Sequence, residues 1–73
     1  MRARVGVKTI RDGEEIELLE LSFRNHDREL WRCLVLSEEP KRERYVFFKI
    51  GEELLSMNTD EERSRIIAEQ GGK

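Results

Sequence analysis

The sequence predicts a small α+β domain in which a four-stranded antiparallel meander (ββββ) precedes one C-terminal α-helix. Three observations predict this fold: apolar and polar residues alternate from Ala3 to Ile50, turn-forming residues divide that region, and a helix-capping pattern follows it. The 73 residues suffice for a single domain, residues 1–73, with a small core. The expected elements are strands over residues 3–10, 15–24, 29–37 and 44–50, a short helical turn over 52–57, a helix over 59–70 and a frayed tail over 71–73.

The turn between the first two strands is the strongest local signal in the chain. It contains Asp12 and Gly13, the residues that best tolerate the positive φ angles of a type I′ hairpin turn. A two-residue loop at this position sets Thr9 opposite Ile16. The sequence therefore predicts both the first hairpin and its register.

The second strand changes its apolar face partway along. Ile16 and Leu18 share one face, whereas Leu19 and Leu21 share the other. A β-bulge that places Leu18 and Leu19 together opposite Val7 would restore the alternation. The alternative is a strand that is apolar on both faces.

The third and fourth strands follow a polar break at residues 25–28. The third is apolar on both faces, which predicts a central position in the sheet. Pro40 cannot continue a ladder and separates the third strand from the fourth. The fourth strand alternates between a face with Val46, Phe48 and Ile50 and a face with Tyr45, Phe47 and Lys49.

The C-terminal helix is predicted from its first turn. Thr59 and Glu62 have the spacing of a capping box, in which each side chain accepts a hydrogen bond from the other residue's backbone N–H. The apolar seam of this helix is narrow, because it contains only residues 66–68. The apolar residues that share a predicted face indicate a core of Val5, Val7, Leu18, Leu21, Phe23, Cys33, Val35, Val46, Phe48 and Ile66.

Composition excludes most chemistries. A lone His26 and a lone Cys33 offer no metal cluster, and none of the five glycines lies in a phosphate-binding pattern. We therefore expect no enzymatic activity, no metal and no cofactor. The single cysteine favours a reducing, cytoplasmic location, and the apolar runs are too short for a signal peptide or a membrane span.

The surface of the fourth strand is the candidate functional region, because one thin helix is little cover for a sheet with two partly apolar faces. We expect a non-enzymatic protein-interaction or self-associating, homodimeric module. The alternative partner is single-stranded nucleic acid, whose bases would stack on Tyr45 and Phe47 while cations meet phosphates. The net charge of −2 favours protein. A closed sheet that buries these rings would leave no site. The candidate surface comprises Trp31, Arg32, Arg42, Arg44, Tyr45, Phe47 and Lys49.

Overall fold

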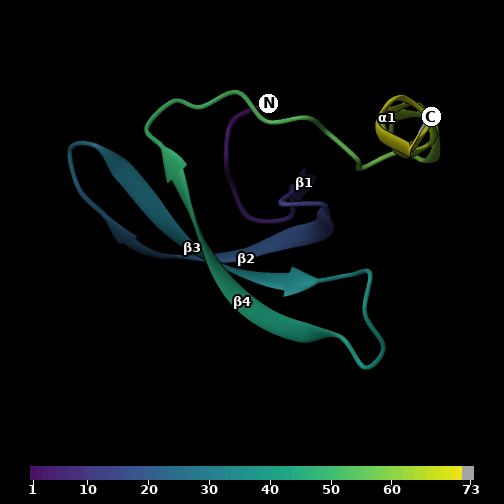
Figure 1. The fold of residues 1–73 in the computed structure, drawn as a ribbon. Coiled ribbons are helices and arrows are strands. Elements are labelled where there is room, and N and C mark those ends of the chain that lie inside the picture. Colours follow the sequence, from purple (N-terminus) through teal and green to yellow (C-terminus); the bar gives the residue numbers. More distant parts are fainter. Residues whose placement is uncertain (72–73) are drawn as a thin grey trace.

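A computed structural model describes residues 1–71 and shows the predicted α+β fold (Figure 1). One antiparallel sheet has its strands in sequence order, followed by one helix. The strand order of a meander places β2 and β3 inside the sheet and β1 and β4 at its edges. The elements are β1 (Lys8–Arg11), β2 (Glu14–Arg24), β3 (Arg28–Val35), β4 (Arg42–Lys49) and α1 (Asp60–Gly71).

The first hairpin is formed as its turn residues predict. Asp12 and Gly13 have φ angles of 55° and 79°, the left-handed values of a type I′ turn. Thr9 lies opposite Ile16, as expected. Local turn chemistry therefore determines this register.

The first strand is shorter than predicted, because the chain leaves the sheet before Lys8. The Gly6 N–H donates to the Leu18 carbonyl and the Val7 carbonyl accepts from the Leu18 N–H, both at 2.9 Å. Gly6 and Val7 thus both lie opposite Leu18, which makes a bulge, and Gly6 adopts a φ of 93° there. The bulge at Val7 therefore lies in the first strand and not, as predicted, in the second, whereas the register shift that β2 has at Leu19 is against β3. Val5, predicted to be in the core, is 68% exposed.

Two irregularities in β2 change which side chains face the core. Leu19 and Ser22 have no partner in the β2–β3 register, and each extra residue reverses the alternation that follows. Phe23 therefore pairs with Leu30 on the face away from the core and is 54% exposed. Leu21 keeps the core side but is 39% exposed. Both were predicted to be core residues and lie outside it.

The core occupies one face of the sheet, which we call the inner face. The chain before β1 and the chain after β4 cover it, and Leu54 and Ala3 pack into it. Residues 52–57 form neither helix nor strand, so the predicted helical turn is wrong. Their backbone bonds instead to the N-terminal region. The Leu54 N–H donates to the Met1 carbonyl at 2.7 Å, and the Met57 N–H donates to the Lys8 carbonyl at 2.8 Å. The buried inner-face residues of the strands are Thr9, Ile16, Leu18, Trp31, Cys33, Val35, Val46 and Phe48.

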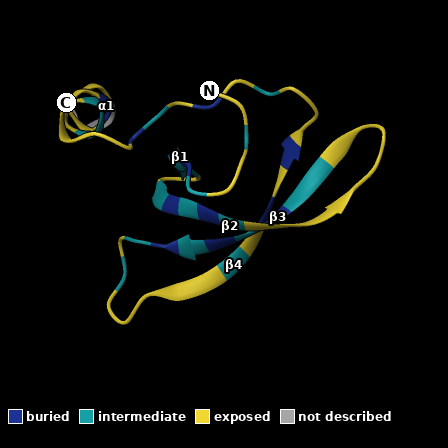
Figure 2. Ribbon diagram, turned by 180° about the vertical axis from the view of Figure 1, so that it is seen from behind, coloured by how far each residue is buried: buried dark blue, intermediate teal, exposed yellow. Residues whose placement is uncertain are grey.

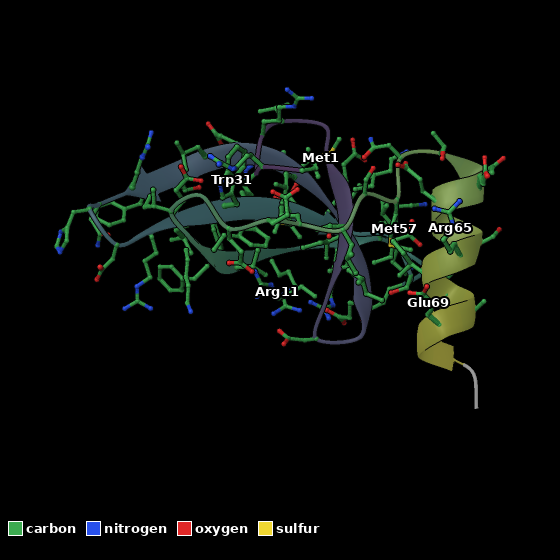
Figure 3. The ribbon with its side chains drawn as sticks, turned by 90° about the horizontal axis from the view of Figure 1, so that it is seen from above. Met1, Arg11, Trp31, Met57, Arg65 and Glu69 are labelled. Atoms are coloured by element: carbon green, nitrogen blue, oxygen red, sulfur yellow. The ribbon has the colours of Figure 1, made fainter. Side chains whose placement is uncertain are left out.

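Helix α1 stands beside the sheet rather than across it (Figures 1 and 3), with Met57 between the strands and the helix. The capping box is present: the Glu62 N–H donates to Thr59 Oγ1 at 3.1 Å, and the Thr59 N–H donates to the Glu62 carboxylate at 3.2 Å. The apolar seam is narrower than predicted, because Ile66 is 8% exposed but Ile67 is 50% exposed. Apart from the ion pair between Arg63 and Glu15 at 2.7 Å, the helix is therefore weakly anchored to the sheet.

The C-terminal boundary differs slightly from the prediction. Helix α1 includes Gly71, and residues 72–73 of the predicted frayed tail lie outside the described residues. Within residues 1–71, no helix is long and apolar enough to cross a membrane.

Candidate functional site

The face opposite the core, which we call the outer face, carries a row of apolar side chains across three strands. Phe23 of β2 pairs with Leu30 of β3, which pairs with Phe47 of β4. Tyr45 lies on the same face, two residues from Phe47. Side chains of directly paired residues lie close enough to touch. These four residues, Phe23, Leu30, Tyr45 and Phe47, are the outer aromatic patch.

Exposure distinguishes this patch from the core. Phe23 is 54% exposed, Phe47 50% and Tyr45 57%, whereas the neighbouring Phe48 is 2% exposed. Figure 2 shows β4 largely as exposed, while buried positions recur along β2 and β3. Bends in the sheet therefore do not bury the aromatic rings of the outer face.

Charge on the outer face is distributed unevenly along the strands. Arg28 and Lys49 lie opposite each other near the tip of the β2–β3 hairpin, and the Arg28 guanidinium lies 4.7 Å from the centre of the Phe47 ring. Further along the same face, Glu17 and Glu43 flank β3. The patch thus lies between a cationic end and an acidic end.

Arg32 lies between these ends and is neutralised locally. It donates to Glu43 at 3.0 Å and to Glu20 at 3.2 Å. The hydrogen bonds with Glu43 and Glu20 raise the pKa of Arg32 above its ordinary value. These two ion pairs link β3 to β2 and to β4, and they leave little of the Arg32 charge for a ligand.

Arg42 and Arg44, two further residues of the candidate surface, lie on the inner side of β4. Arg44 reaches one oxygen of Glu14 at 2.5 Å, and Arg42 reaches the other at 2.9 Å. Arg42 also holds Glu38 at 2.7 Å, and this hydrogen bond lowers the pKa of the Glu38 carboxyl. Their role is to connect β4 to the first hairpin, so they do not join the outer aromatic patch.

Trp31 was expected at the candidate surface but is 4% exposed in the core. Its indole N–H donates to Glu29 at 2.9 Å, which satisfies the polar end of a buried ring. The structure therefore brings together only Tyr45, Phe47, Lys49 and the neutralised Arg32 from the predicted set.

Sequence reasoning missed three residues of this surface: Phe23, Leu30 and Arg28. Leu30 could have been placed on this surface. It directly precedes Trp31 in a strand that is apolar on both faces, so the two side chains point to opposite sides of the sheet. Phe23 could not be placed, because its face depends on the extra residue Ser22 in β2.

The lone histidine lies at the surface and the lone cysteine lies in the core. His26 lies in an exposed turn, 3.8 Å from Asp27. Cys33 is fully buried, and burial raises the pKa of its thiol to about 11. Among residues 1–71, no group of three or more His, Cys, Asp or Glu residues is placed to hold a metal ion.

Comparison of the chain with protein-family models, curated proteins and solved structures gives no match. Because one fold can carry many functions, the α+β arrangement by itself assigns none. The outer aromatic patch is the feature from which a function has to be inferred.

Proposed function

We propose that this protein is a non-enzymatic self-associating module, in which the outer aromatic patch of one copy associates with that of a second copy. The observation that supports the proposal is the half-exposed row of Phe23, Tyr45 and Phe47 on one face. Scattered apolar residues need no explanation, but a contiguous patch on adjacent strands is typical of an interaction surface.

The charge distribution favours a second copy as the partner. In a two-fold dimer the same surface meets itself, and an axis perpendicular to the charge gradient brings each end of the gradient to the opposite end. The cations Arg28 and Lys49 of one copy then lie near the acids Glu17 and Glu43 of the other. A small domain also gains from association, because a core of this size supplies only roughly 3–5 kcal/mol.

The test is to place a charge within the patch. Phe47→Asp should give a folded chain that no longer associates, as measured by light scattering over a range of concentrations. The matched control is Leu55→Asp, because Leu55 is 52% exposed, close to the 50% of Phe47, but lies outside the sheet. Association that survives Phe47→Asp unchanged, or that is lost equally in Leu55→Asp, contradicts the proposal.

Single-stranded nucleic acid is the second candidate, and one observation favours it. The Arg28 guanidinium over the Phe47 ring, with Lys49 beside it, is the combination of cation and aromatic surface that such sites use. Among residues 1–71, Arg28 and Lys49 are the cations that adjoin the patch outside the ion pairs of Arg32. If nucleic acid is the partner, Arg28→Ala and Lys49→Ala weaken oligonucleotide binding and flatten its salt dependence.

A further inference from the structure

The edge of β4 that points away from β3 is an open sheet edge. The Ile50 N–H donates to the Asp27 carbonyl at 3.1 Å, so even-numbered residues of β4 direct their backbone groups toward β3. The odd-numbered residues direct theirs away from the sheet. Within residues 1–71, the outward backbone groups of Glu43, Tyr45 and Phe47 make no hydrogen bond.

This edge carries few of the features that normally prevent strand pairing. The β3–β4 register runs without a bulge, and Pro40 lies before the strand rather than in it. Only one end is closed: the Lys49 N–H donates to the Glu52 carboxylate at 2.9 Å, and the Lys49 carbonyl accepts from the Glu52 N–H at 3.0 Å. The open stretch is therefore short and has a defined end.

We propose that two copies pair their β4 edges antiparallel, about a two-fold axis through Val46. The inference rests on the proposed self-association and adds its geometry. In this register Tyr45 lies opposite the partner's Phe47. The side chain of Glu43 faces that of the partner's Lys49 beyond the last hydrogen-bonded pair, because Glu52 occupies the outward backbone groups of Lys49. Each Tyr45–Phe47 pair exchanges both of its main-chain hydrogen bonds, which satisfies the open groups of these two residues. The two four-stranded sheets become one continuous sheet.

The side chains of β4 select this register over its neighbours. An axis through Tyr45 would set Lys49 opposite Lys41 and Phe47 opposite Glu43. An axis through Phe47 would set Tyr45 opposite Lys49. Directly opposed like charges destabilise an antiparallel pair, whereas aromatic pairs and unlike charges stabilise it. Only the axis through Val46 gives aromatic pairs and ion pairs at once.

The pairing also accounts for the exposed rings. Tyr45 and Phe47 of both copies come together on the outer face of the joined sheet, so the two patches become one. Such an edge contact is small, and contacts of this size are typically weak and transient. The pairing is therefore expected to depend on protein concentration.

Charge reversal at Glu43 and Lys49 tests the register. Glu43→Lys alone and Lys49→Glu alone set like charges opposite each other and should weaken self-association about tenfold or more. A 1:1 mixture of the two variants restores unlike pairs, because one copy then carries two cations and the other two acids. We expect the mixture, measured by sedimentation velocity, to associate like the wild type.

Amide exchange provides the second measurement. The N–H groups of Tyr45 and Phe47 should exchange more slowly as protein concentration rises, whereas packing through the outer face alone would leave them open. If the wild type associates and Phe47→Asp prevents it, but the single charge variants associate as the wild type does and these amides exchange as in a monomer, the strand pairing is wrong and the proposed function stands. A wild type that is monomeric throughout overturns both.

Discussion

Phe47 and Phe48 are adjacent in sequence but lie on opposite faces of β4, so they provide a direct test of the fold. Phe48 is 2% exposed, and the Arg11 guanidinium lies 4.3 Å from the centre of its ring. Truncating a buried phenylalanine to alanine costs about 3–5 kcal/mol. The small core of this 73-residue chain supplies only roughly 3–5 kcal/mol of stability. Phe48→Ala should therefore remove a large share of the stability.

Phe47→Ala is the matched control. Half of this side chain is already exposed, and burying a whole phenylalanine contributes about 1.5–3 kcal/mol. The expected loss is therefore about 1 kcal/mol, with a small addition from the contact with Arg28. Both variants and the wild type are compared by urea denaturation at one low protein concentration, because association would add to the apparent stability.

The reasoning fails if Phe48→Ala loses less than about 1 kcal/mol, since a side chain in the core cannot be removed at that cost. It also fails if Phe47→Ala is the more destabilised of the two, because the faces of β4 would then be reversed. Phe48→Leu guards against a variant that is too unstable to measure. The free energy of unfolding of Phe48→Leu should lie between those of Phe48→Ala and the wild type.

Two further predictions concern Cys33 and Thr59. Burial raises the pKa of the Cys33 thiol from its ordinary 9.0 to about 11, so the unfolded chain loses this proton first and stability falls as pH rises from about 9 toward 11. Cys33→Ala should abolish that part of the pH dependence in urea titrations, and an unchanged profile contradicts the burial. Thr59→Ala removes the helix cap and should cost α1 about 1 kcal/mol. Because α1 is weakly anchored, amide exchange should increase in the helix alone, and equal loss of protection in the sheet contradicts this.

Features encoded by neighbouring residues could be predicted from the sequence. The type I′ turn depends only on Asp12 and Gly13, and the capping box only on Thr59 and Glu62. The facing of Tyr45 and Phe47 also follows from alternation, because β4 pairs with β3 without a register shift. In each case the decisive interaction lies within a few residues of chain.

Features that depend on distant pairing could not be predicted. Phe23 moved to the outer face because Ser22 has no partner in β3, and no local pattern marks Ser22 as extra. Residues 52–57 were expected to be helical because Leu54 and Met57 have helical spacing. Their backbone groups bond instead to the N-terminal region, more than 40 residues away. Trp31 is different, because it alternates with Cys33 and Val35 of the predicted core, so its burial could have been predicted from the sequence.

Self-association through the outer aromatic patch is the central claim, and sedimentation equilibrium tests it most directly. The wild type should change with rising concentration, from the low micromolar to the millimolar range, from a mass of 8.7 kDa toward twice that value. Phe47→Asp should remain at 8.7 kDa throughout the same range. A wild type that stays at the monomer mass at every concentration, indistinguishable from Phe47→Asp, contradicts the account.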